Sequence, residues 1–235
     1  MLAIVTGGSS GIGKAICQQL RVGGYDVVNV SRRRESKEET DLQYNAGLIF
    51  ERCDVVDIPK LQSIISRHDA DVLINNVGIL PLQDFLEQTV EDYEAILNTN
   101  LKSAVFATQS ALGGMVKRRE GQILNIASTS GCHAAPDIPI YGASKAALIN
   151  FTQSIAAEYG RFGVRCNCIC PGLVNTMLCG DSQVPEEQLN LIPLRRVAEP
   201  AEIADLVSWI LKTPYLNGAV IVVDGGKTHG VYRWV

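Results

Sequence analysis

The sequence predicts an α/β fold with a doubly wound parallel sheet of seven strands and helices on both faces. Strand-like and helical segments alternate along the chain, and a glycine-rich turn joins the first strand to the first helix. Strand segments such as Val72–Ile74 are almost continuously apolar, which suits a sheet buried on both faces. With 235 residues, of which 46 % are hydrophobic, we expect residues 1–235 to form a single domain.

Seven segments have the composition of strands and end at turn or helical patterns. They are Leu2–Thr6, Asp26–Ser31, Leu48–Cys53, Val72–Asn75, Gln122–Ser128, Val164–Cys170 and Ala219–Val223. The clearest helical pattern extends from Thr99 to Arg119, where apolar or small residues recur at spacings of three and four. No internal repeat or linker separates these segments.

Composition argues against several classes of protein. No apolar run approaches the roughly 20 residues of a membrane span, and the N-terminus lacks a signal-peptide pattern, so we expect no membrane anchor and no cleaved leader. A net charge of −4 without a basic block argues against nucleic acid as the main partner. The seven cysteines are an odd number in a chain that needs no disulfides to fold, which favours reduced thiols and a cytoplasmic location.

Three of the cysteines, Cys166, Cys168 and Cys170, alternate within one predicted strand. They could be interpreted as a metal cluster. Alternation places all three on one face of the strand, and no histidine lies nearby, so we expect them to pack in the core and predict no metal site.

The glycine-rich turn, Thr6–Gly13, lies between a buried strand and a helical pattern. Glycines there leave backbone amides open to a ligand, and the start of a helix favours an anion. This arrangement predicts a site for the pyrophosphate of a dinucleotide. Gly7, Gly11 and Gly13 do not have the usual G-x-G-x-x-G spacing, so an ordinary tight connection is the alternative.

Three further polar residues fall at the same edge of the predicted sheet. Ser128 ends the fifth strand, and Tyr141 and Lys145 open the next helix, where their spacing puts them on one face. The lysine ammonium favours the phenolate and so lowers a tyrosine pKa that begins near 10. These residues suit general acid/base chemistry, whereas an unrelated surface pair is the alternative interpretation.

With these motifs the chain resembles the short-chain dehydrogenase/reductase family, and the resemblance covers essentially all 235 residues. It rests on motifs that occur in the family's order: TGGSSGIG at 6–13, CDV at 53–55, NNVG at 75–78, NTNL at 98–101, Ser128, YGASK at 141–145, Pro171-Gly172 with Thr176, Asn217-Gly218 and DGG at 224–226. Val77 stands where the family usually has alanine. The resemblance implies a Rossmann fold and hydride transfer between a nicotinamide cofactor and a carbonyl or alcohol substrate.

The resemblance also implies the role of each catalytic residue. Tyr141 exchanges a proton with the substrate oxygen, and Ser128 donates a hydrogen bond to that oxygen. Lys145 binds the nicotinamide ribose and lowers the pKa of Tyr141. Asn100 holds a water that links Lys145 to solvent.

The cofactor-binding residues follow in the same way. Asp54 and Val55 are expected at the adenine, Asn75 on the adenosine side, and Val174 and Thr176 at the nicotinamide carboxamide. The complete expected set is Gly7, Ser9, Ser10, Gly11, Ile12, Gly13, Ser31, Arg32, Arg33, Asp54, Val55, Asn75, Val77, Gly78, Tyr141, Lys145, Pro171, Gly172, Val174 and Thr176.

The end of the second predicted strand indicates which cofactor is bound. An acidic residue there would accept from the ribose 2′-OH of NAD, but this chain has Ser31, followed by Arg32 and Arg33. A hydroxyl and two guanidiniums suit a 2′-phosphate, so we expect NADP(H) rather than NAD(H). Ser10 stands where many NADP-dependent relatives have a basic residue, and a solvated arginine loop is the alternative.

The substrate is less well defined. Residues 173–194 are expected to cover it with apolar side chains, and the pattern is most similar to 3-oxoacyl-[acyl-carrier-protein] reductases, including PLRR at 193–196 and PAEIA at 200–204. Arg119 matches one basic residue that meets the carrier protein in those enzymes, whereas the second position is Phe162, next to Arg161. His133 could touch substrate or simply be solvated.

Two alternatives for the function remain. One is a small-alcohol, sugar or secondary-metabolite dehydrogenase or ketoreductase, and the other is a non-catalytic dinucleotide sensor, which the four catalytic residues disfavour. The resemblance also implies a homodimer or homotetramer that pairs through the helix at Thr99–Arg119 and the helix before it. Gly113, Gly114, Ala104, Ala107 and Ala111 would permit close approach.

Overall fold

The computed structural model describes residues 1–33, 47–176 and 184–229. Its seven strands form one parallel sheet with the order β3-β2-β1-β4-β5-β6-β7. The strands are β1 (Leu2–Thr6), β2 (Asp26–Ser31), β3 (Leu48–Arg52), β4 (Val72–Asn75), β5 (Gly121–Ile126), β6 (Val164–Pro171) and β7 (Val220–Val223). The predicted doubly wound α/β fold is therefore confirmed.

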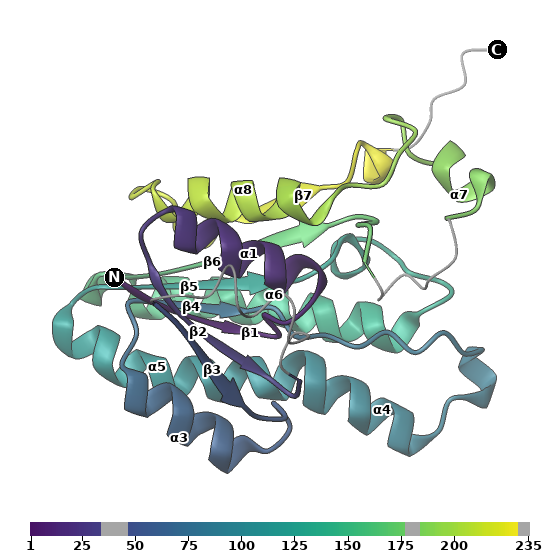
Figure 1. Ribbon diagram of the computed structural model, residues 1–235. Coiled ribbons are helices and arrows are strands. Elements are labelled where there is room, and N and C mark those ends of the chain that lie inside the picture. The colour runs from purple at the N-terminus through teal and green to yellow at the C-terminus, as the bar shows by residue number, and fades with distance from the viewer. Residues whose placement is uncertain (34–46, 177–183, 230–235) are drawn as a thin grey trace.

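Helices cover both faces of this sheet, as Figure 1 shows. Helices α1 and α8 lie together on one face, and α3, α5 and α6 lie on the other. The helices are α1 (Gly11–Val22), α3 (Ile58–His68), α4 (Val90–Leu97), α5 (Ser103–Arg118), α6 (Pro139–Tyr159), α7 (Glu186–Asn190) and α8 (Pro200–Leu211). No helix among the described residues is both long and apolar enough to span a membrane.

The core follows the alternation of side chains along each strand. In β1, Ala3 and Val5 pack toward α1 and α8, whereas Ile4 packs toward α3 and α5. Because both faces are buried, β1 is apolar at every one of these positions. The sheet is thus held rigidly between two hydrophobic layers.

The three alternating cysteines of β6 lie in this core, as expected. Cys166, Cys168 and Cys170 are fully buried, and they pack among apolar side chains of α5 and α6. Burial raises the pKa of Cys166 to about 12, so this thiol is neutral at physiological pH.

The structure corrects the predicted helix at Thr99–Arg119. Helix α5 begins at Ser103, and a π turn over Asn98–Lys102 joins it to α4. Arg119 has a left-handed backbone with φ 56° and caps the helix instead of continuing it. A π turn inserts one extra residue into a helix, which periodicity of side chains does not reveal.

One edge of the sheet collects the residues of interest. The strand order reverses between β1 and β4, and ligands of such sheets bind beyond the carboxyl ends of the strands at this switch point. The glycine-rich turn follows β1 there, Asn76–Gly78 follows β4, Ser128 follows β5 and Gly172 follows β6. The fold therefore brings four distant segments to one place.

Candidate active site

The glycine-rich turn is shaped by glycines that no other residue could replace without strain. Gly7 and Gly11 have φ values of +72° and +50°, and a Cβ at Gly13 would collide with the carbonyl oxygen of Gly7. Gly8, which sequence reasoning did not single out, leaves room for Asn29, since its Cβ would lie 2.8 Å from the amide carbon and oxygen of Asn29. The turn thus presents backbone amides and the start of α1 at the switch point, a fit for a pyrophosphate.

The segment after β4 is bound to this turn by Asn76, not by its neighbour Asn75. The amide of Asn76 donates to the Thr6 carbonyl at 3.0 Å, and its backbone N–H donates to Thr6 Oγ1 at 3.0 Å. The amide of Asn75 donates instead to Asn125 and Thr108 inside the core. The side chain of Asn75 therefore points into the core, because strand alternation turns it inward.

Lys145 and Tyr141 lie on the buried face of α6. Lys145 is 3 % exposed, and its ammonium donates to the carbonyl of Ile126 at 2.9 Å and lies 5.7 Å from the Tyr141 ring centroid. Burial lowers the pKa of Lys145 to about 8, and the Cys170 thiol partly opposes this shift. At neutral pH the lysine is still mainly protonated, so a positive charge faces the tyrosine.

Ser128 is held close to this helix by a glycine contact. Its Oγ accepts from the backbone N–H of Ser130 at 3.1 Å and begins a short turn over Thr129–Gly131. A Cβ at Gly131 would lie 2.6 Å from the carbonyl carbon of Lys145, and one at Gly142 would lie 2.9 Å from the carbonyl oxygen of Ser130. These two glycines let the serine loop rest directly against α6. β5 itself ends at Ile126, two residues earlier than expected.

Asn100 lies in the π turn and clamps the segment after β4. Its amide oxygen accepts from the N–H of Ile79 at 2.8 Å, and its amide nitrogen donates to the Ile79 carbonyl at 3.0 Å and to Ser144 Oγ at 3.1 Å. A Cβ at Gly78 would lie 3.3 Å from Lys145 Nζ. Asn100, Gly78 and Lys145 therefore lie close together.

The segment after β6 closes over the glycine-rich turn. Val174 forms a β-bridge with Ala198, and a Cβ at Gly11 would lie 3.1 Å from the methyl group of Thr176. Gly172 packs on Asp224, whose Cβ lies 2.8 Å from the position of a glycine Cβ. Of the expected covering segment 173–194, residues 177–183 lie outside the described part of the chain.

Arg32 and Arg33 follow directly after β2. Arg32 and Arg33 are exposed, and a guanidinium nitrogen of Arg32 lies 4.0 Å from the carboxylate of Asp54. Ser31 differs from the expectation: its hydroxyl is buried and donates to the amide oxygen of Asn29 at 2.6 Å. Ser31 therefore cannot donate to a ligand while this bond is made.

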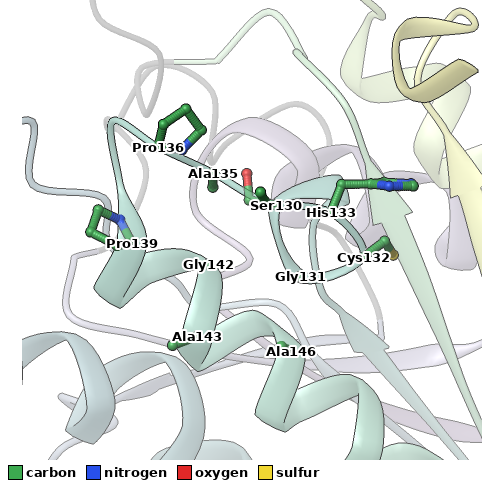
Figure 2. A pocket seen from close by; sticks show the side chains of 11 residues that line it. Ser130, Gly131, Cys132, His133, Ala135, Pro136, Pro139, Gly142, Ala143 and Ala146 are labelled. Atoms are coloured by element: carbon green, nitrogen blue, oxygen red, sulfur yellow. The ribbon is translucent and has the colours of Figure 1, made fainter. Parts of the chain in front are cut away.

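A hollow of ≈ 470 Å³ lies beside the serine loop, and Figure 2 shows its lining. Pro136 and Pro139 lie at one side and His133 and Cys132 at the other, with Ala143 and Ala146 of α6 below. The lining is largely apolar, and it includes none of Ser128, Tyr141 and Lys145. Burial raises the pKa of Cys132 to about 11, so its thiol is neutral.

The structure differs from two expectations: that Arg119 lies near the substrate site, and that small residues of α5 form a pairing surface. Arg119 precedes β5, so within one chain it lies at the opposite edge of the sheet from Ser128, and its guanidinium donates to the carbonyl of Arg161 at 3.0 Å. The small residues Ala104, Ala107 and Ala111 are buried within the chain, where they pack on the parent sheet. They therefore do not form an exposed pairing surface.

Comparison with known proteins agrees with this geometry. A family model described as short chain dehydrogenase matches residues 1–186. Carbonyl reductase family member 4 from Xenopus laevis is 36 % identical over 228 residues, which cover 94 % of this chain and 95 % of that protein. The 3-oxoacyl-[acyl-carrier-protein] reductase MabA from Mycobacterium bovis is 33 % identical over 236 residues, which cover 97 % and 92 %. The structure of ElxO with NADP bound matches with a TM-score of 0.89 at 25 % identity, covering 97 % of this chain and 98 % of that one. The chain is therefore an oxidoreductase of the short-chain dehydrogenase/reductase family that acts on CH–OH or carbonyl groups.

Proposed function

We propose that the protein is an NADP(H)-dependent reductase that interconverts a ketone and a secondary alcohol, with Tyr141 as the general acid/base. One observation carries the proposal most directly: the Lys145 ammonium lies 5.7 Å from the Tyr141 ring centroid at the edge where the glycine-rich turn opens. A nicotinamide cofactor would be held by this turn and by Thr176, and it would supply or take up the hydride.

Each hydrogen-bond donor at the site has a defined use. The Oγ of Ser128 accepts from Ser130, so its own hydrogen can be donated to the substrate oxygen. Tyr141 gives its proton to that oxygen during reduction and takes one from the alcohol during oxidation. The negative charge that develops on the oxygen is thus met by two hydroxyl donors.

Lys145 and Asn100 support the tyrosine. An ammonium has three hydrogens, of which one is donated to the carbonyl of Ile126, so others can reach the cofactor ribose and a water. The amide of Asn100 bonds to Ile79 and Ser144, so Asn100 acts by positioning the backbone of Ile79 and the start of α6. A water held by Asn100 would therefore donate to its amide oxygen, because both amide hydrogens are already donated.

NADP(H) is supported by charge at the end of β2. Arg32 and Arg33 are exposed there, and a guanidinium pairs well with a phosphate dianion. ElxO, a structural relative, has NADP bound. The guanidinium of Arg32 lies 4.0 Å from the carboxylate of Asp54, which we expect at the adenine.

For the substrate, we favour a 3-oxoacyl thioester, because the MabA relative reduces that class by its name. A small ketone is the second candidate, which the carbonyl reductase relative favours. We expect the enzyme to act in the cytoplasm, where its thiols stay reduced.

The substrate test measures NADPH oxidation with acetoacetyl and longer 3-oxoacyl thioesters, small ketones, quinones and keto-sugars. A higher kcat/KM for thioesters, increasing with acyl length, supports the first candidate. Preference for small ketones without any effect of chain length supports the second, and no turnover with any carbonyl contradicts the proposed reaction.

A further inference from the structure

A buried amide connects the end of β2 to the glycine-rich turn. Asn29 is 4 % exposed, and its amide nitrogen donates to the Oγ of Ser9 at 3.1 Å. Ser9 in turn donates to the backbone carbonyl of Arg33 at 2.6 Å. On the other side, the amide oxygen of Asn29 accepts from Ser31 at 2.6 Å.

The donor and the acceptor of each hydrogen bond from Arg33 through Ser9 and Asn29 to Ser31 are fixed. A serine hydroxyl has one hydrogen, and Ser9 gives its hydrogen to Arg33, so Ser9 can only accept from Asn29. The amide nitrogen of Asn29 must therefore face Ser9, which leaves the amide oxygen for the hydroxyl of Ser31. Neither serine has a hydrogen left for a ligand, and a phosphate accepts hydrogen bonds only from donors.

We propose that Asn29 is a positioning residue for cofactor selectivity: through Ser9 it holds the backbone of Arg33 against the glycine-rich turn, where the Arg33 guanidinium can meet a 2′-phosphate. This inference rests on the proposed preference for NADP(H). In this inference Ser9 and Ser31 hold Asn29 and the backbone of Arg33 in place and do not donate hydrogen bonds to the cofactor.

The surrounding contacts agree with such a role. The N–H of Gly7 donates to the carbonyl of Val30 at 2.8 Å, so the turn and the end of β2 are already adjacent. Gly8 lacks the side chain that would collide with Asn29. Arg32 has no part in this link: its guanidinium lies 4.0 Å from the exposed carboxylate of Asp54. The link through Asn29 and Ser9 therefore acts on Arg33.

The test compares the wild-type protein with Ser9→Ala, Asn29→Val and the conservative variant Ser9→Thr. Ser9→Ala removes the hydroxyl that links Asn29 to Arg33. Ser9 is partly exposed and uncharged, so this variant should fold even if Asn29→Val does not. We expect the ratio of kcat/KM for NADPH to that for NADH to fall about tenfold in both variants, because a misaligned guanidinium loses much of its charge-assisted contact. Ser9→Thr keeps a hydroxyl and should restore the ratio.

A second readout separates positioning from a general structural effect. Adenosine 2′,5′-bisphosphate and 5′-AMP compete for the adenosine half of the site, and they differ only in the 2′-phosphate. The variants should lose affinity for the bisphosphate but not for 5′-AMP. Equal losses for both probes, or a ratio unchanged in folded Ser9→Ala, would overturn the inference alone. A wild-type protein that uses both cofactors equally would overturn the proposed NADP(H) preference and this inference with it.

Discussion

The ammonium of Lys145 lies 5.7 Å from the ring centroid of Tyr141 and donates to the carbonyl of Ile126 at 2.9 Å. The carbonyl belongs to the last residue of β5, and the lysine belongs to α6. A strand end and a helix are therefore joined through a buried charge beside the tyrosine. Burial of this charge has a consequence for stability that varies with pH.

We predict that Lys145→Met stabilises the fold more at pH 7 than at pH 9.5. Burial lowers the folded-state pKa of Lys145 from 10.5 to about 8. Below pH 8 both states bind the proton and the desolvation cost is fully present. Between pH 8 and 10.5 the unfolded state binds more protons than the folded state, so stability of the wild-type protein rises there and the cost disappears.

The measurement is the difference in Tm between Lys145→Met and the wild-type protein at the two pH values. The change in side-chain packing is the same at both pH values, so the difference between them reports the charged form of Lys145 together with its hydrogen bond to Ile126. A difference that is the same at pH 7 and pH 9.5 would show that Lys145 is not desolvated in the folded protein.

Gly131→Ala should disturb both stability and catalysis. The added Cβ would lie 2.6 Å from backbone of α6 at Lys145, and backbone cannot move aside cheaply. We expect a loss of about 1–3 kcal/mol in the free energy of unfolding. Turnover should fall roughly tenfold to a hundredfold, because Ser128 is carried by the same loop.

Gly113→Ala is the matched control. Gly113 is an exposed residue of α5, and no atom lies within 4 Å of the position of its Cβ. Alanine should therefore stabilise the helix by about 0.5–1 kcal/mol. Denaturant unfolding of both variants checks the pair. If Gly131→Ala is as stable and active as Gly113→Ala, the serine loop does not rest on α6.

The next prediction concerns the oligomeric state. We expect a homodimer or homotetramer, as the family resemblance implies. Light scattering at micromolar concentration should give a multiple of 25.5 kDa. A mass near 25.5 kDa would exclude both assemblies. The burial of Ala104, Ala107 and Ala111 means that pairing must use other residues.

Cofactor preference should depend mainly on Arg32 and Arg33. Arg32→Leu should reduce kcat/KM for NADPH about tenfold to a hundredfold and leave the value for NADH little changed, since a charge-assisted contact to phosphate contributes roughly 1.5–3 kcal/mol. Both cofactors are compared at one salt concentration, because salt screens exposed charges. An equal effect on both cofactors would mean that Arg32 does not meet the 2′-phosphate.

Adding Ser31→Asp to Arg32→Leu should invert the preference toward NADH. The new carboxylate can accept from the ribose 2′-OH and repels a phosphate. In the wild-type protein the amide oxygen of Asn29 faces Ser31. A carboxylate at position 31 cannot donate to that oxygen, so the amide of Asn29 must turn its nitrogen toward the carboxylate. Retained preference for NADPH in the double variant would leave Arg33 as the dominant residue.

The fold and the shared helix face of Tyr141 and Lys145 could be predicted from sequence because they follow from local patterns. Apolar strands, the glycine-rich turn and the spacing of Tyr141 and Lys145 each act within a few residues. The π turn at Asn98–Lys102 could not be predicted, since the periodicity of apolar side chains does not reveal one extra residue in a helix. The inward direction of Asn75 follows from strand alternation, so the sequence held that signal.

The link from Asn29 to Arg33 could not be predicted for a similar reason. Ser31 looked available to a ligand in sequence, and only the structure shows that its hydrogen is donated to Asn29, two residues earlier on the same face of β2. Long-range hydrogen bonds between polar residues have no periodicity, so they are found only once the segments are placed together.

Turnover of NADPH with a carbonyl substrate by the wild-type protein and by Tyr141→Phe tests the central claim most directly. The substitution removes the phenolic hydroxyl and leaves the ring beside Lys145, so NADPH affinity should change little. We predict that kcat falls by at least ~10², the usual scale of acid/base catalysis. Turnover in Tyr141→Phe equal to that of the wild-type protein, with the same substrate, would contradict the role of Tyr141 as the proton donor.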